Sequence, residues 1–117
     1  MAVKTPTLER TGGAYDPVPI VTWRGVTSAD TFEHYLVRGQ YGFAGSLQIS
    51  GTFGGATVSL TSSNDGTNFF PAEDPTGALI TTTVGAIFEI SLSSAYIKPN
   101  ISGGSGYTLD FILVLRG

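Results

Sequence analysis

The sequence predicts an all-β protein: a single antiparallel β-sandwich, either jelly-roll or immunoglobulin-like, that follows an extended N-terminal arm. Three observations predict this fold class. Apolar residues alternate with polar ones in short runs of period two, turn signals separate the runs about every 8 to 12 residues, and no helical stripe persists. About eight such runs are typical of a sandwich or a small barrel. We therefore divide the chain into an arm at residues 1–17 and a sandwich domain at 18–117.

Residues 1–17 have no strand periodicity. Pro6 and Pro17 favour extended backbone in the residues before them, and Gly12-Gly13 is a flexible pair. An extended segment can lie across a neighbouring subunit and add a strand to an exposed sheet edge. We therefore expect a partner interface at Leu8, Arg10 and Tyr15 of the arm, and also at Trp23 in the strand that follows it.

The domain begins with a strand that starts at Val18 and ends at Gly25, and a weaker strand is predicted at 32–37. The most distinct unit follows. Residues 46–53 and 56–61 both alternate, and the two glycines between them, Gly54 and Gly55, can each adopt the positive φ of a type I′ turn. This pattern predicts a β-hairpin.

Further turns and strands follow to the C-terminus. The Asn64-Asp65-Gly66 turn predicts a second hairpin, and Pro99 limits the strand at 96–99 to a sheet edge or ends it. Residues 100–106 are rich in Gly and predict a flexible connector. The other predicted strands are 78–83, 87–92 and 107–115, of which the last is the most apolar.

Length and composition exclude several classes of protein. A chain of 117 residues can bury one ordinary core, and the absence of Cys excludes disulfides, a thiolate nucleophile and Cys-bound metal centres. No apolar run approaches the roughly 20 residues of a membrane-spanning helix. Residues 1–10 lack the apolar core of a secretory signal, so we expect synthesis and use in the cytoplasm of the producing cell.

The charge pattern indicates assembly. Six Lys and Arg against nine Asp and Glu give a net charge of −3, and the scattered cations form no basic stripe for direct binding of DNA or RNA. Only 13% of the residues are charged, whereas Gly, Ser and Thr make up more than a third of the chain. So little charge favours a surface that neighbouring subunits cover.

We predict no catalytic, cofactor-binding or metal-binding residues. His34 is the only histidine, and its neighbour Glu33 would point to the opposite face of a strand. Asp65, Glu73 and Asp74 are explained by turns and a polar loop rather than by a glycosidase pair or a calcium loop. The Trp and Tyr residues favour core or interface positions over a platform for sugar rings.

Two segments carry a family resemblance. Residues 50–60 (SGTFGGATVSL) with the SNDG turn at 63–66, and residues 96–104 (YIKPNISGG), resemble small structural proteins of tailed bacteriophages. The resemblance covers residues 45–115 and rests on turn and strand signatures. It implies a virion component, such as a β-sandwich decoration or cement protein on the capsid, which is commonly a trimer. Because the matched residues are structural, the resemblance assigns no functional residues in this chain.

The sequence thus predicts a non-enzymatic capsid decoration protein that binds the outer surface of the head and bridges major capsid protein subunits. The expected partners are the major capsid protein and further copies of the chain in a homotrimer, with neither nucleic acid nor membrane bound directly. The expected location is the virion, after synthesis in the host cytoplasm. Two alternatives stay open: a carbohydrate- or receptor-binding module of a tail or fibre, and a tail-tube or head–tail adaptor subunit.

Overall fold

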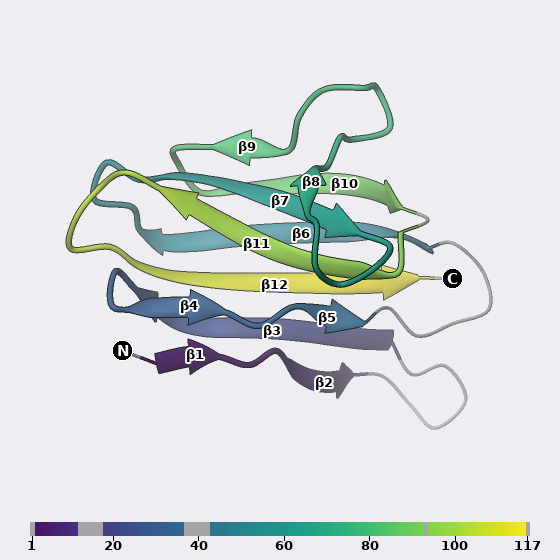
Figure 1. Cartoon of the computed structure of the whole chain (residues 1–117), viewed down its shortest axis with the longest axis horizontal. Coiled ribbons are helices and arrows are strands. Elements are labelled where there is room, and N and C mark those ends of the chain that lie inside the picture. Colours follow the sequence, from purple (N-terminus) through teal and green to yellow (C-terminus); the bar gives the residue numbers. More distant parts are fainter. Residues whose placement is uncertain (1, 12–17, 37–42, 93, 117) are drawn as a thin grey trace.

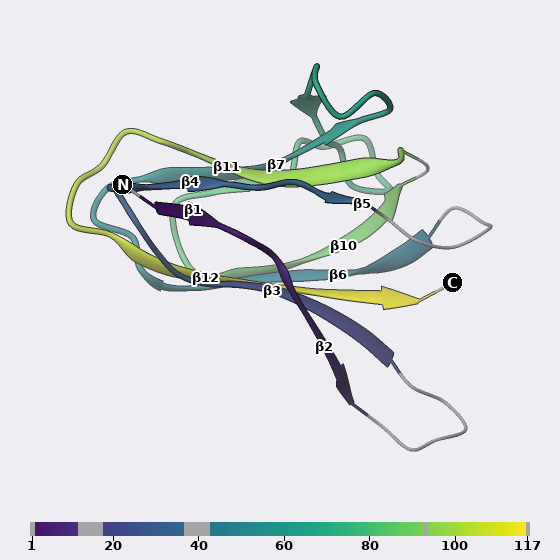
Figure 2. The same cartoon turned by 60° about the horizontal axis from the view of Figure 1, so that its bottom comes forward.

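The computed structural model describes residues 2–11, 18–36, 43–92 and 94–116, and most of these residues lie in strands (Figure 1). The strands form two layers, which Figure 2 shows one above the other. We call the first layer the β12 sheet; its order is β10 (Ala86–Leu92), β6 (Phe43–Thr52), β12 (Thr108–Arg116), β3 (Val18–Thr27), β2 (Thr7–Thr11).

The second layer is the β11 sheet. Its order is β5 (Tyr35–Leu36), β11 (Tyr96–Ser102), β7 (Thr57–Ser63), β8 (Phe70–Pro71), and β9 (Thr81–Thr82) pairs with β7 as well. A short parallel pair, β1 (Ala2–Lys4) with β4 (Asp30–Phe32), lies beside this layer. The predicted all-β sandwich is confirmed, with this one parallel pair as an exception to its antiparallel pairing.

The strand order decides between the two predicted architectures. Counted from β3, the chain forms nested pairs: β3 with β12, β5 with β11, β6 with β10, and β7 with β8 and β9. The pairs alternate between the two sheets. This nested arrangement is the strand order of a jelly roll, and an immunoglobulin-like sandwich does not have it.

The core lies between the two layers. The inward side chains of the β12 sheet include Trp23, Leu47 and Phe111, and those of the β11 sheet include Leu60 and Ile97. These residues sit at alternate positions along their strands, as the pleat requires. The alternation that predicted the fold class is therefore the pattern that fills the core.

The predicted hairpin between 46–53 and 56–61 is wrong, although its turn is present. Gly54 and Gly55 both have positive φ, and the Ala56 N–H donates to the Phe53 carbonyl oxygen at 2.9 Å. The turn, however, carries the chain from β6 in one sheet to β7 in the other. Both edges of β6 are occupied, by β10 and β12, so no edge is left for β7 to pair with.

The second predicted hairpin is confirmed, with a wider loop. Thr61 pairs with Pro71 and Ser62 with Phe70, so residues 63–69 form the loop.

Pro99 does not end its strand, since β11 continues to Ser102. Residues 98–102 pair with β7 alone, and the proline therefore lies where one edge of the strand has no strand partner.

The N-terminal segment differs from the predicted arm. Residues 2–4 pair with β4, and residues 7–11 pair with β3 at the edge of the β12 sheet. The segment passes from one layer to the other between these strands (Figure 2). It is extended, as predicted, but its main chain pairs with strands of its own domain. Alternation failed to reveal these strands because they are short and lie at sheet edges.

Candidate interaction surface

The four residues predicted to contact a partner do not form one surface. Leu8 and Arg10 lie in the edge strand β2, opposite Val21 and Pro19 of β3. Tyr15 falls outside the described residues. In the described part of the chain, no strand pairs with the second side of the β2 main chain, and the prediction for Leu8 and Arg10 stays a prediction.

Trp23 is a correction, because it is a core residue. Its side chain is 1% exposed, and its ring packs edge-on against Phe32 with ring centroids 6.5 Å apart. The indole Nε1–H donates to the carbonyl oxygen of Glu33 at 3.0 Å, which satisfies its only polar group. A side chain held in this way cannot contact a partner without unfolding of the core, nor can it form part of an exposed sugar platform.

A stronger candidate is the outer face of the β12 sheet. Ile112, Gln48 and Ile87 lie side by side in one row across β12, β6 and β10. Val114 and Ile20 lie side by side in the next row, across β12 and β3. These side chains alternate with buried core residues of the same strands, so they point away from the core. We call the four apolar members the outer apolar patch: Ile20, Ile87, Ile112 and Val114.

The outer apolar patch is unusual for the outer face of an antiparallel sheet, which is ordinarily polar. Ile87 is 64% exposed, and the other three members are half-buried by their neighbours in the sheet. Strand β12 is apolar on both faces along 111–114, a pattern typical of strands that are covered on both sides. No other described strand covers this face (Figure 2), although Thr22, which lies beside Ile112 in β3, is only 1% exposed.

Polar and charged residues lie within and beside the outer apolar patch, since Gln48 and Ser46 of β6 separate Ile87 from the other three members. Asp110 and Glu89 lie two positions from Ile112 and Ile87 along β12 and β10, and Arg24 precedes Gly25, which donates to Asp110. The carboxylate of Asp110 accepts the N–H of Gly25 at 2.8 Å, which fixes the β-bulge between β12 and β3. An apolar centre with a polar rim is the usual anatomy of a protein–protein interface.

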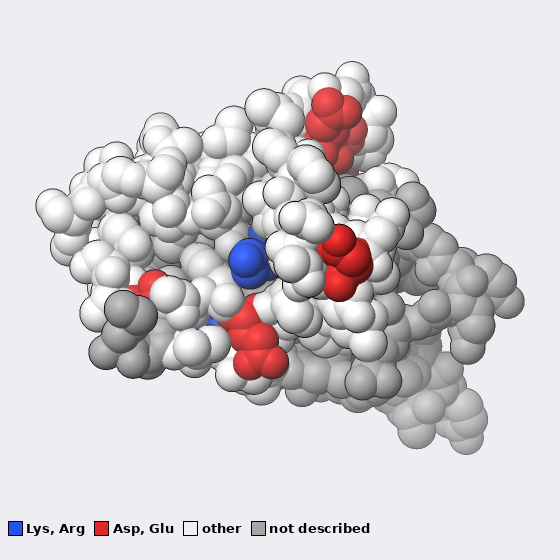
Figure 3. Space-filling view, in the orientation of Figure 1, with Lys and Arg blue, Asp and Glu red and all other residues white. Residues whose placement is uncertain are grey.

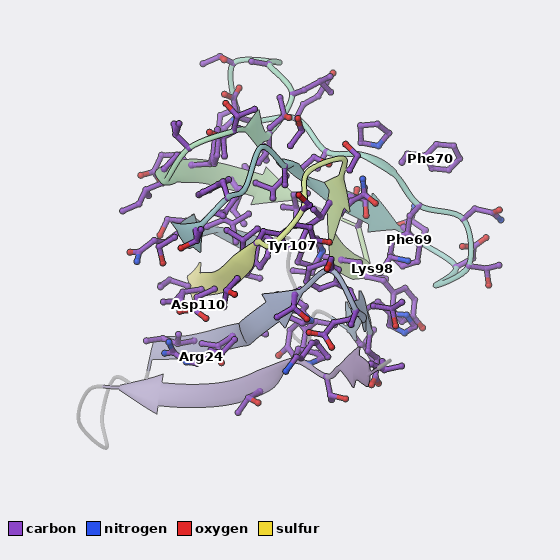
Figure 4. The ribbon with its side chains drawn as sticks, turned by 90° about the vertical axis from the view of Figure 1, so that its left-hand side faces the viewer. Arg24, Phe69, Phe70, Lys98, Tyr107 and Asp110 are labelled. Atoms are coloured by element: carbon purple, nitrogen blue, oxygen red, sulfur yellow. The ribbon has the colours of Figure 1, made fainter. Side chains whose placement is uncertain are left out.

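The outer face of the β11 sheet is different in character. Its β7 side chains are Thr57, Ser59 and Thr61, and white surface dominates the view of this face in Figure 3, with small separate charged patches. One cluster stands out. The rings of Phe69 and Tyr96 contact His34, with centroids 5.9 and 4.9 Å away, and the Nζ of Lys98 lies 4.4 Å from the centroid of Phe69 (Figure 4).

The loop at 63–69 supports this cluster through Asp65. Its carboxylate accepts the N–H groups of Asn68 and Thr67, at 2.8 and 2.9 Å, and the hydroxyl of Ser63 at 2.7 Å. These hydrogen bonds hold the pKa of Asp65 well below its ordinary value, with the Asn68 N–H the largest cause. The next residue, Gly66, has positive φ and lies against the ring of Tyr96. Asp65 therefore organises a turn, as predicted.

Asp74 also has a local role. Asp74 accepts bonds from the hydroxyl and N–H of Thr76, within the loop that joins β8 and β9. Among the described residues, no group of three or more His, Asp or Glu side chains is placed to hold a metal ion. The described part of the chain also contains no helix that is long and apolar enough to span a membrane.

Comparisons with known proteins add no relative. No protein-family model, curated protein or solved structure matches this chain.

Proposed function

We propose that this chain is a non-enzymatic decoration protein of a tailed-bacteriophage capsid, which binds the outer surface of the head and bridges major capsid protein subunits. The outer apolar patch carries the proposal, because apolar side chains on a sheet face that no other described strand covers favour a protein partner. The phage-like segments at 50–66 and 96–104 and the low proportion of charged residues support it.

The proposed mechanism requires no chemistry. Burial of apolar surface contributes about 25 cal/mol per Å² removed from water, and the surrounding polar residues set the orientation of the contact. A shell presents many equivalent sites, so modest contacts at each copy add up through multivalency. We include a homotrimer in the proposal, since a decoration protein that bridges several capsid subunits gains from having several contact surfaces.

Co-sedimentation with expanded, undecorated heads of the phage that encodes the chain tests the proposal. We expect the wild-type protein to sediment with heads at micromolar concentration and Ile112→Lys to lose most of this binding, because the ammonium group would enter an apolar contact. Ser59→Lys, on the outer face of the other sheet, is the matched control and should bind like the wild type. Failure of the wild-type protein to bind would overturn the proposal.

Native mass spectrometry tests the homotrimer separately. A monomer at every concentration would remove the trimer from the proposal without affecting head binding. Native mass spectrometry also tests one alternative, because a tail-tube or head–tail adaptor subunit is expected to form rings of sixfold or twelvefold symmetry.

The other alternative is a carbohydrate- or receptor-binding module of a tail or fibre. It would require Trp23 on an exposed face. The burial of Trp23 removes that platform. A role in receptor binding would therefore need another surface, and a glycan array without hits would argue against it.

A further inference from the structure

A groove lies between β4 and β11, on the side of the molecule opposite the outer apolar patch. Its volume is about 230 Å³, and it is lined by residues 30–32 of β4, residues 98–101 of β11 and Tyr107. It exists because the sheet is split at this point. In the described structure β4 pairs with β1 alone, while β5, which follows β4 in the chain, pairs with only the first two residues of β11.

Because the sheet is split, each wall of the groove is a strand edge. Two strand edges face each other across it without pairing, so main-chain N–H and C=O groups along both walls, except at Pro99, which has no N–H, have no strand partner among the described residues on this side. A ligand that fills the groove must therefore donate hydrogen bonds at some points and accept them at others. Hydroxyl groups do both.

The charges of the groove favour a ligand without net charge. Asp30 and Lys98 both line it, and the antiparallel course of the two segments places them toward opposite ends. The Asp30 carboxylate is fixed by the N–H and hydroxyl of Thr27, at 2.8 and 3.0 Å, and Lys98 is held over the ring of Phe69. An anion would be attracted to Lys98 and repelled by Asp30, and a cation the reverse, so neither sign is favoured overall, whereas a neutral polar molecule meets both charges as hydrogen-bonding groups.

The rest of the groove combines apolar and polar surface. Phe32, Ile101 and Tyr107 are half-buried and pack against the core, and Pro99 is buried, which gives an apolar floor. The side chains of Thr31 and Asn100 are exposed at the rim. An apolar floor with a few polar groups is typical of small-molecule sites, and the volume is below the roughly 300 Å³ at which pockets for drug-sized ligands begin.

We propose that this groove binds one neutral hexopyranose ring, either as a free sugar or as the terminal unit of a glycan. The pyranose ring has an apolar face for the floor and a ring of hydroxyl groups for the two strand edges and for Asp30, Asn100 and Lys98. The proposal is independent of the proposed function, because it uses the opposite side of the molecule.

Two-dimensional ¹H–¹⁵N NMR of the full chain tests this proposal. We would titrate the labelled protein with glucose, galactose, mannose and N-acetylglucosamine, and with the methyl glycoside of each. At least one neutral sugar should cause saturable shifts in the amide signals of residues 30–32, 98, 100, 101 and 107, with a millimolar dissociation constant. Saturation by a glycoside but not by its free sugar would assign the site to glycan ends, and saturation by the free sugar would assign it to free sugars as well.

Variants and charged sugars supply the controls. Asn100→Ala should weaken binding about tenfold through the loss of its hydrogen bonds, whereas Gln48→Ala, exposed on the outer face of the β12 sheet, should bind like the wild type. Glucuronate and glucosamine should bind more weakly than glucose. Shifts that rise linearly without saturation, unchanged affinity in Asn100→Ala, or tighter binding of either charged sugar would overturn the proposal.

Discussion

Two neighbouring glycines in the connector from β11 to β12 test how this connector packs against the turn between β6 and β7. Gly103 and Gly104 have similar positive φ values, 67° and 73°. A Cβ atom at Gly103 would meet no atom within 4 Å, whereas one at Gly104 would lie 2.5 Å from the backbone N of Ala56 and 2.7 Å from its Cα. Ala56 is fully buried and closes the turn that links β6 to β7.

The two alanine variants separate conformational cost from steric cost. Gly103→Ala loses only the freedom to adopt positive φ, which costs about 1 to 2 kcal/mol of unfolding free energy. Gly104→Ala has the same cost and must also displace the backbone of Ala56. Overpacking of this kind costs about 1 to 3 kcal/mol more. We therefore expect Gly104→Ala to lose roughly twice as much stability as Gly103→Ala.

Urea denaturation, followed by the fluorescence of Trp23, measures both losses. The midpoints should fall in the order wild type, Gly103→Ala, Gly104→Ala, with unchanged m-values. Equal midpoints for the two variants would refute the reasoning, because they would mean that the connector does not pack against the turn at Ala56. A larger loss in Gly103→Ala would refute it more strongly.

Three further predictions concern the loop, the core and the N-terminal strands. The pKa of Asp65 is lower in the folded state than the ordinary Asp value near 3.8. The stability that this difference contributes is complete above pH 3.8 and is lost as the pH falls through the folded-state pKa. On acidification below pH 3.8, the urea midpoint of Asp65→Asn should therefore fall less than that of the wild type. Trp23, the only tryptophan, should show blue-shifted emission and weak quenching by acrylamide, and quenching as strong as that of free tryptophan would contradict its burial. Deletion of residues 1–11 should lower the thermal midpoint by several degrees, because it uncovers the edges of β3 and β4, and an unchanged midpoint would restore the idea of a free arm.

The fold class was predictable because the alternation of apolar residues is a local pattern. Each inward residue, such as Leu47 or Leu60, lies two positions from the next, and this spacing is visible in the sequence. Strand pairing is not local. The Gly54-Gly55 turn fits a hairpin equally well in conformation and in apolar spacing, and only the occupation of both edges of β6 excludes it. That occupation depends on β10 and β12, which lie far along the chain.

The candidate surface was partly visible in the sequence as well. The continuous apolar run of β12 at 111–115 identified the most apolar strand, and a run without alternation indicates cover on both faces. Ile20 and Ile87 could not be assigned to the same surface, because their positions beside this strand depend on the registers of β3, β6 and β10. The groove was not predictable at all. It arises from a break in pairing between β4 and β11, and a missing hydrogen-bonded neighbour leaves no signal in the residues themselves.

The residues on the two outer faces of the sandwich indicate where the surface expected from the low proportion of charged residues lies. The proportion of charged residues alone suggested a covered surface without saying where it lies. The outer apolar patch lies on the β12 sheet, while Ser and Thr side chains and the groove with Lys98 lie on the side of the β11 sheet. A protein that binds a shell through one face leaves the other face in solvent. If both proposals hold, attachment through the patch orients the groove away from the shell, where a sugar can reach it, so a sugar that saturates the groove should leave head binding unchanged.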